Sequence, residues 1–477
     1  MIVLAALISE LPAQNTDDAV RYSRTQTGGT ALSHGMGGAI GAVGADFSSA
    51  SVNPAGIGMY RMSEFGGSAS IFNASGSSTF YGSSSDDRKF NFNIPNLHLV
   101  IHSPSFNRLK TKGWLSTTFA IGYNKQSNFS ERWSFKGVNP DNSLVKQFIL
   151  DAGNASPGNL NPFGSALAYQ TFLIDPDQTT GSGYTSIYGP LNGGMTQRGL
   201  IEARGRAGET NIAFAGNYSN RLYVGGSLAI RRIVYEREYT YSERNETDSV
   251  PGFNNLEYRQ TLSDRATSIA LRAGAIYRVN DFFRLGASAL LPLDYTVRTE
   301  YFSEMSSSLA TGDFYYASPD GEYQYKLRNP ARFTFSGAFV YKKLGLLSID
   351  YEMVNYSRLR LIDDADSYAA FNDQIRDGFR NSGNLRIGLE GRFNDLYARG
   401  GVQLIGTPYE NTAFGKAYQV YSLGGGYRNN YFFMDVSYSF SGQDLMFFPY
   451  SAPGLDIQPA NTRIRNNNFV FSIGTRF

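Results

Sequence analysis

Hydrophobic and polar residues alternate with a period of two along most of the chain, which is the pattern of β-strands with two different faces. The last segment shows it clearly, because Phe469, Phe471 and Ile473 share one face while Ser472 and Gly474 share the other. A soluble sandwich also alternates, but its outer face is densely charged. Here the second face carries glycine, serine and ionisable groups, as a polar lumen does. The pattern therefore favours strands that turn one face to lipid and the other to the inside of a barrel.

Fourteen segments alternate in this way. They span residues 65–73, 91–103, 114–134, 198–217, 221–243, 256–278, 282–300, 323–341, 344–358, 383–393, 396–405, 416–428, 431–441 and 466–477. The number is even, as it is in single-chain barrels of bacterial outer membranes.

Connections between these segments alternate between short and long from the third segment onward. The short ones are 218–220, 279–281, 342–343, 394–395 and 429–430, and the long ones lie near 135–197, 244–255, 301–322, 359–382, 406–415 and 442–465. Outer-membrane barrels join their strands by short periplasmic turns and longer extracellular loops. The sequence therefore predicts an all-β fold: a 14-stranded antiparallel transmembrane β-barrel over residues 64–477, with helical extracellular loops.

The N-terminal part of the chain does not alternate. No stretch of roughly 20 apolar residues, the length that a membrane-spanning helix needs, occurs in the sequence. Residues 1–14 begin with an apolar run and are interpreted as the remnant of a signal peptide.

Residues 15–63 concentrate glycine, including Gly35, Gly37, Gly38 and Gly41. Such a density allows close backbone packing and turns with positive φ. Apolar residues are interleaved with these glycines, which a flexible linker does not have. We therefore expect an N-terminal hatch that fills the barrel as a plug.

This segment also carries a family resemblance. Residues 30–42, Asp46 and residues 51–57 resemble the hatch and Asn-Pro-Ala signature of the FadL/TodX outer-membrane long-chain fatty acid transporters, particularly relatives from Bacteroidetes. Residues 329–333 and 346–351 are also similar to that family. The resemblance implies the outer membrane of a Gram-negative bacterium and uptake of fatty acids or other hydrophobic molecules by passive diffusion. In the family the ligand leaves sideways through a gap in the barrel wall.

The Asn53-Pro54-Ala55 step is expected to join hatch and barrel. Proline fixes its own φ and steers the preceding residue to extended conformations, so this dipeptide sets the direction of the chain. The amide of Asn53 has donors and an acceptor for the backbone groups that such a break exposes. We interpret the step as the element that positions the hatch against the exit gap, with a purely structural turn as the alternative.

Two apolar stripes in the stretch 135–197 are candidates for the lining of a ligand groove. They consist of Leu144, Val145, Phe148 and Ile149 in one predicted helix and of Phe163 and Leu167 in another. Packing of these loop helices on themselves explains the same pattern. Pro95 interrupts the second segment and removes a donor from the strand ladder, so it marks either the wall opening or a position above the membrane.

Composition narrows the function further. The chain has no cysteine and only three histidines, and its net charge of +2 includes no basic block, so neither a metal site, a cofactor nor a nucleic-acid partner is predicted. No catalytic constellation is recognised, and we expect a transporter and not an enzyme.

The predicted partners are a hydrophobic small molecule, outer-membrane lipid and the barrel assembly machinery. The last of these is expected to recognise the terminal Phe477, which resembles the C-terminal signal of such barrels. Two other functions stay open at this point. One is a general diffusion porin, and the other is a FadL-like partner or shuttle barrel that works with secretion-system subunits in type IX protein secretion.

Overall fold

A computed structural model describes most of the chain. The described residues are 16–24, 28–106, 111–179, 181–186, 194–246, 250–342, 344–362, 368–412, 415–451, 454 and 456–477. The predicted signal-peptide remnant, residues 1–14, lies outside them.

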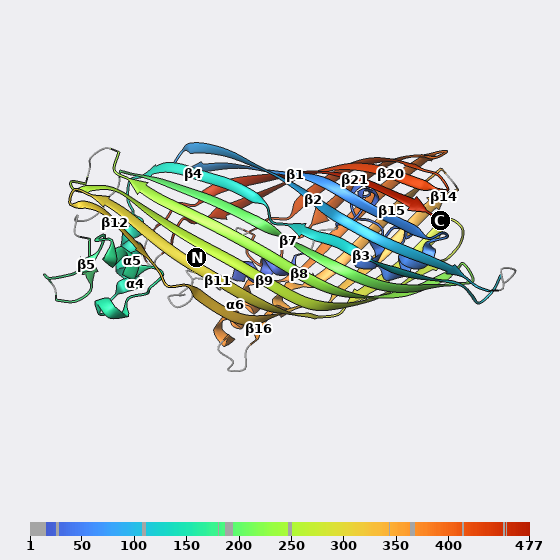
Figure 1. Cartoon of the computed structure of the whole chain (residues 1–477), viewed down its shortest axis with the longest axis horizontal. Coiled ribbons are helices and arrows are strands. Elements are labelled where there is room, and N and C mark those ends of the chain that lie inside the picture. The colour runs from blue at the N-terminus through green and yellow to red at the C-terminus, as the bar shows by residue number, and fades with distance from the viewer. Residues whose placement is uncertain are drawn as a thin grey trace.

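Fourteen strand passes form one closed antiparallel sheet (Figure 1). In chain order they are β1 (Glu64–Phe80), β2 (Ser83–Pro104), β3 with β4 (Trp114–Asn128 and Glu131–Asn139), β7 (Met195–Tyr218), β8 (Leu222–Arg244), β9 (Phe253–Arg278), β10 with β11 (Phe283–Leu290 and Leu293–Leu309), β12 with β13 and β14 (Gly312–Ala317, Gly321–Asn329 and Arg332–Tyr341), β15 (Gly345–Asn355), β17 (Asn381–Phe393), β18 (Leu396–Ile405), β19 (Tyr418–Arg428), β20 (Phe432–Phe447) and β21 (Ala460–Arg476). The barrel closes because β1 pairs with β21 from Glu64↔Arg476 onward. The predicted barrel is confirmed.

Two regions form longer strands than the sequence predicted. The stretch 301–322 was expected to be a long loop, but β11 continues to Leu309 and β12 starts at Gly312. Likewise, β1 runs to Phe80 and β2 starts at Ser83. These strand ends project beyond the apolar band, so their outer face meets water, while inner residues such as Phe80, Met305 and Leu309 pack in the core under the loop helices. The alternation of hydrophobicity is lost there although the hydrogen-bond ladder continues.

The extracellular loops carry short helices and short strands. Between β4 and β7 lie α4 (Leu144–Ala152), η2 (Pro157–Asn159), α5 (Ser165–Gln170) and the short pair β5 (Asp175–Pro176) and β6 (Tyr184–Thr185), and between β15 and β17 lie η3 (Tyr356–Arg358), β16 (Arg360–Ile362) and α6 (Ala369–Gly378). Figure 1 shows α4 and α5 at the end of the barrel opposite the C-terminus. The predicted helical loops are confirmed.

The outer surface has an apolar band with an aromatic border at the end where the short turns lie. The band includes the exposed side chains of Phe65, Ile121, Phe214, Leu228, Ile269, Phe335, Ile349, Leu389, Leu423, Val436 and Phe469. Its border includes Trp114, Tyr218, Tyr277, Tyr341 and Tyr431, which are also exposed. An apolar belt between aromatic girdles is the lipid-facing surface of a transmembrane barrel. Within the described part of the chain, no helix has the length and hydrophobicity to span a bilayer.

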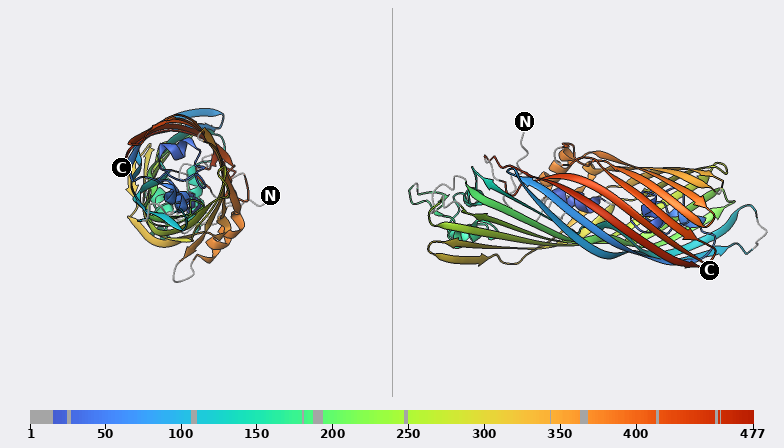
Figure 2. Two further views of the ribbon diagram at one scale, coloured as in Figure 1. Left: turned by 90° about the vertical axis from the view of Figure 1, so that its right-hand side faces the viewer. Right: turned by 90° about the horizontal axis from the view of Figure 1, so that it is seen from above.

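The segment before β1 lies inside the ring of strands (Figure 2, left). It contains α1 (Thr16–Ser23), α2 (Ala31–Gly35), α3 (Ser49–Val52) and η1 (Pro54–Met59). Helix α2 contacts β18 to β21, and η1 contacts β3, β7, β8 and β9 on the other side. Residues 28–60 therefore touch opposite walls of the barrel, and we call them the plug.

The alternation of connections predicts which sites a protease reaches on intact cells. We expect cleavage within 135–197 and 359–382, and protection of the turns at 394–395 and 429–430, because the short turns lie on the periplasmic side. Mass spectrometry of the fragments released by an added protease measures this. Cleavage at 394–395 or 429–430 with the loops spared would invert the topology.

Candidate ligand path

An extracellular cavity of about 280 Å³ lies between the loop helices and the upper ends of β8 and β9. Its lining comprises Leu144, Gln147, Phe148, Asp151, Asn161, Phe163, Gly164, Tyr239, Tyr241, Tyr258, Gln260, Phe448, Pro449, Tyr450 and Ser451. Seven of these fifteen residues are aromatic, and most of the others carry polar groups. Such a mixture suits an apolar ligand that has a polar end.

The structure divides the six predicted groove residues into two groups. Leu144, Phe148 and Phe163 line the cavity. Val145 and Leu167 are completely buried in the apolar core under the loop, and Ile149 packs against the same core. The helical stripes therefore serve both packing and lining, and a contact of any of these residues with ligand stays a prediction.

Glu243, which the sequence analysis did not identify, holds α4 in place. Ser143 caps the helix and donates its hydroxyl to Glu243 at 2.5 Å, and the backbone N–H of Leu144 donates to the other carboxylate oxygen at 2.8 Å. A carboxylate at a helix N-terminus is stabilised by the helix dipole. Burial and the neighbouring Glu243 raise the pKa of Tyr450 above its ordinary value, so its phenol stays protonated. The sequence offered no signal because Glu243 is a hundred residues from its partner.

The plug meets the barrel wall backbone against backbone at glycines. A Cβ added to Gly401 of β18 would lie 2.2 Å from the amide nitrogen of Gly37, whose φ of +58° also favours glycine. A Cβ on Gly41 would lie 2.1 Å from the Ser336 hydroxyl of β14. Of the other two predicted hatch glycines, Gly35 also packs against the wall, at Gly424 of β19, and Gly38 has a φ of +71°, which favours glycine.

The Asn-Pro-Ala step lies inside the plug and starts η1. The side-chain NH₂ of Asn53 donates to the carbonyl oxygens of Gly41, at 2.7 Å, and of Ala275 in β9, at 3.2 Å. Its carbonyl oxygen accepts the N–H of Ala55 at 3.2 Å. Pro54 packs against Gly225 of β8. One amide thus connects two parts of the plug with the wall, while the role of this step in transport stays a prediction.

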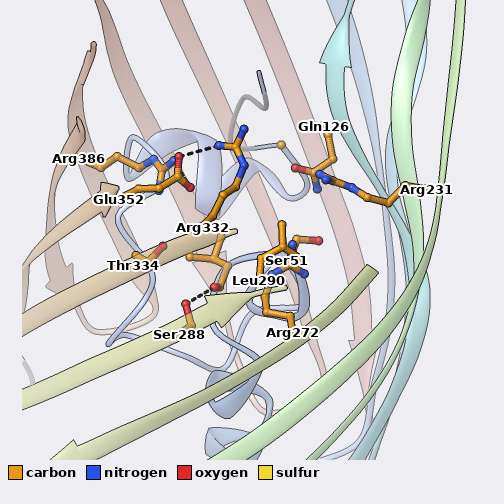
Figure 3. A pocket seen from close by; sticks show the side chains of 12 residues that line it. Ser51, Gln126, Arg231, Arg272, Ser288, Leu290, Arg332, Thr334, Glu352 and Arg386 are labelled. Carbon is orange, nitrogen blue, oxygen red and sulfur yellow. Dashed lines mark hydrogen bonds and ion pairs between the residues drawn. The ribbon is translucent and has the colours of Figure 1, made fainter. Parts of the chain in front are cut away.

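A charged pocket lies above the plug (Figure 3). Its ion pairs are Arg231–Glu209 (3.0 Å), Arg272–Glu209 (3.5 Å), Arg332–Glu352 (3.1 Å) and Arg386–Glu352 (3.2 Å). Four guanidinium groups thus face two carboxylates. The Nε of Arg386 and the Nε2 of Gln126, which also lines the pocket, are buried donors without a hydrogen-bond partner among the described residues. The four guanidinium groups thus exceed the two carboxylates in charge. The two unpartnered N–H groups can donate hydrogen bonds to an anionic group.

A second network of ion pairs lies on the periplasmic side, beside α2. Its contacts are Arg392–Glu390 (2.8 Å), Arg399–Glu390 (2.7 Å), Arg399–Asp435 (2.5 Å) and Arg428–Asp435 (2.5 Å). Arg399 and Asp435 are almost completely buried. These charges are paired with one another and do not line an open aqueous path.

The barrel wall has a seam between β2 and β3. Their hydrogen-bond ladder begins at Pro104↔Ser116 and ends at Asn96↔Asn124. From Pro95 outward, β2 pairs only with β1, and β3 bulges at Gln126 and then pairs only with β7. Pro95 is thus the residue at which β2 separates from β3.

Side chains and an overlap cover the seam. The amide of Asn96 donates to that of Asn124 at 2.7 Å, and Asn124 donates to Ser51 of the plug at 2.8 Å. Farther out, β4 lies on the lumen side of the hairpin of β1 and β2, with Trp133 against Gly76. No backbone ladder joins β2 to β4. This stretch of wall is therefore held by side chains and packing.

Several solved structures share the architecture of this chain. The toluene transporter TodX of P. putida matches with 13% identity and a TM-score of 0.55 over 95% of this chain and 99% of that one. A FadL homologue of Pseudomonas aeruginosa has 12% identity and a TM-score of 0.56 over 94% and 98%. The monoaromatic hydrocarbon channel CymD has 12% identity and a TM-score of 0.53 over 95% and 98%. The chain has their fold.

No protein-family model matches the sequence, and no curated protein matches it. The shared fold and the lipid-facing band together place the protein in the outer membrane of a Gram-negative bacterium. By their names, two of the three solved structures are a toluene transporter and a monoaromatic hydrocarbon channel, and the third is a FadL homologue.

Because the plug touches the wall at Gly401, substitution of this glycine should change conductance, whereas substitution of its neighbour Gly400 in β18 should not. We expect Gly401→Ala to displace the plug and to raise single-channel conductance in planar bilayers, since its new methyl group overlaps the backbone of Gly37. Gly400→Ala is the matched control, because its Cβ meets nothing closer than Leu423 at 3.9 Å. Both variants should assemble, as judged by heat-modifiable gel mobility. Equal conductance of Gly401→Ala and the unaltered protein would contradict the prediction.

Proposed function

We propose that this barrel takes up long-chain fatty acids across the outer membrane by passive diffusion, and that they leave sideways through the seam between β2 and β3. The observation that carries the proposal is the end of the β2–β3 ladder at Asn96↔Asn124. Hydrocarbon offers no hydrogen bonds to an open strand edge, so such an edge is tolerated only where something covers it. Side chains can move apart at the seam, whereas a continuous ladder cannot open without breaking backbone hydrogen bonds.

An axial path is the competing route, and the plug opposes it. Residues 28–60 contact both sides of the lumen, and the paired charges of Glu390, Arg399 and Asp435 lie beside α2. A general porin needs a water-filled lumen. The packed glycine contacts between plug and wall favour a route that bends outward above the plug.

The extracellular cavity supports capture of an apolar chain. Burial of one methylene group contributes about 0.8 kcal/mol, so even a part of an acyl chain is held by the aromatic lining. Phe148, Phe163 and Tyr258 supply such surface at the cavity. The names of the solved channels, which include toluene and monoaromatic hydrocarbons, agree with a hydrophobic cargo.

The charged pocket favours an acidic cargo over a neutral hydrocarbon. Its surplus of guanidinium groups and the unpartnered donors of Arg386 and Gln126 suit a carboxylate. Gln126 is also the residue at which β3 bulges, so the pocket adjoins the seam. A fatty acid whose carboxylate enters this pocket brings its acyl chain close to the wall opening.

Locking the seam should stop transport. Asn91 of β2 and Asn128 of β3 face each other across it, with 3.5 Å between their amide groups. We expect the double variant Asn91→Cys/Asn128→Cys, joined by a short thiol-specific crosslinker, to lose uptake of labelled palmitate in reconstituted vesicles. A crosslinker with a reducible bond should restore uptake on reduction. The chain has no other cysteine, so the bridge is specific.

The control places the same crosslink where the ladder is continuous. Ser78 of β1 and Thr462 of β21 have hydroxyl oxygens 2.9 Å apart in paired strands. Crosslinked Ser78→Cys/Thr462→Cys should transport palmitate as the unaltered protein does. Normal uptake with the seam locked would exclude the lateral route.

The choice of cargo is tested at the charged pocket. The double variant Arg231→Gln/Arg386→Gln removes two positive charges but leaves each buried carboxylate one arginine partner. We expect palmitate uptake to fall about tenfold, because a hydrogen bond to a charged group contributes roughly 1.5–3 kcal/mol. Toluene uptake should stay unchanged.

Arg463→Gln is the control, since this arginine lies on the outside and pairs with Asp444. It should transport both compounds normally. Equal loss of palmitate and toluene uptake in the pocket variant would show that the pocket does not recognise the carboxylate, while the lateral route would still stand.

A further inference from the structure

Outward-facing cations form a belt on β7, β8, β9, β11 and β13, which we call the basic belt. It consists of Arg206, Arg232, Arg265, Arg298 and Lys326, all of which are exposed. In register across the sheet, Arg206 lies opposite Val234, Val234 opposite Arg265, and Arg265 opposite Arg298. In the adjacent row, Arg232 lies opposite Thr267, Thr267 opposite Thr296, and Thr296 opposite Lys326. The belt thus crosses five neighbouring strands.

The basic belt borders the apolar band directly. On β8 the next outward-facing residue toward the membrane after Arg232 is Ile230, which is 48% exposed. On β9 the exposed Thr267 follows Arg265 and precedes Ile269, which is 66% exposed. Two residues of a strand span roughly 7 Å, so the Cα atom of Arg232 lies about that far from Ile230 at the edge of the apolar band. Because C-terminal Phe477 and the short turns mark the opposite end, this boundary belongs to the outer leaflet.

Charge compensation within the protein is incomplete at this belt. Arg298 has carboxylate partners, Glu322 at 2.9 Å and Glu300 at 3.4 Å. Arg232 and Arg265 form no ion pair with any described residue. The register also sets Arg265 directly opposite Arg298, and like charges in that position destabilise a sheet. An external anion would relieve this repulsion.

Arg206, Arg232 and Arg265 are diagonal neighbours on one face. Diagonal neighbours in an antiparallel sheet lie about 7–8 Å apart, a distance that one anionic group among arginine side chains can bridge. Tyr123 lies over Gly208 between the first two, since a Cβ on that glycine would lie 2.2 Å from the tyrosine hydroxyl. In the next row outward, Arg204 is paired with Glu236, and Glu300 adds a second carboxylate, so the cations without a carboxylate partner form a narrow surface that follows the membrane boundary.

We propose that the basic belt binds the phosphate groups of a phosphorylated outer-leaflet glycolipid of the lipid A class. Guanidinium groups form charge-assisted, often bidentate hydrogen bonds with phosphate. The apolar band beside Ile230 and Ile269 receives the acyl chains of the same lipid. This site faces outward and is separate from the lumenal route, so it holds whatever the cargo is.

Lipid A binding to the purified, folded barrel in detergent tests the proposal, with native mass spectrometry to count bound lipid during titration. We expect Arg232→Glu/Arg265→Glu to weaken binding of bisphosphorylated lipid A by about tenfold or more, because cations near an anionic headgroup surface contribute additively. Arg198→Glu/Arg244→Glu is the matched control. Both of its arginines are exposed on β7 and β8, farther from the apolar band. It has the same change of charge and should bind lipid A within about twofold of the unaltered protein.

The lipid source is tested with two further probes. Lipid A stripped of both phosphates should bind the unaltered barrel weakly, and inorganic phosphate at the same concentration should not displace bisphosphorylated lipid A. Equal binding of the stripped lipid, displacement by inorganic phosphate, or equal losses in the two double variants would each overturn the proposal. If the glutamate variant does not show heat-modifiable folding, lipid A binding is measured on Arg232→Gln/Arg265→Gln instead. Unchanged binding by that variant would overturn the proposal.

Discussion

Close packing between glycine backbones of the plug and of the barrel wall is the constraint on which the rest of the structure depends. Gly37 against Gly401 and Gly41 against Ser336 leave no room for a side chain. Such contacts need glycine on at least one side, and they bring the plug near enough for its polar groups to bond to the wall. Asn53 uses this proximity, because its amide reaches both the plug and β9.

Filling the lumen in this way decides where an opening can lie. A barrel whose centre is packed has no axial route without movement of the plug, which favours the passage through the wall that we propose. In hydrocarbon an unpaired strand edge is costly, and the protein confines it to the stretch beyond Asn96↔Asn124. There the bulge at Gln126 and the overlap of β4 replace the ladder with side-chain contacts. The seam and the charged pocket meet at Gln126.

Charged side chains are arranged differently on the inner and outer faces of the barrel wall. Inside, arginines stand against buried carboxylates such as Glu209 and Glu352, because an unpaired buried charge is strongly unfavourable. Outside, Arg298 at the hydrocarbon boundary is paired with Glu300 and Glu322, whereas Arg232 and Arg265 form no ion pair with a described residue. The surplus of positive charge above the plug and the uncompensated cations of the basic belt thus lie on the two faces of one wall, and we propose a different ligand for each.

The sequence by itself determined the strand count, the alternation of turns and loops and the two-sided character of the wall, because each of these depends on neighbours along the chain. Period-two alternation located all fourteen passes, but it failed at 301–322 and beyond 65–73, where the strands leave the lipid and one face is no longer selected for hydrophobicity. Glycine density in 15–63 indicated close packing without showing against what.

Only the tertiary structure decided which side chains meet. Leu144 and Val145 are adjacent in one stripe, yet one lines the cavity and the other is buried in the core, because a helical stripe does not reveal what covers each part of it. Glu243 at the start of α4 and the four arginines above the plug come from strands far apart in the chain, so no local pattern joins them. The exact place where β2 leaves β3 likewise depends on strand register, which closure of the barrel sets and local composition does not.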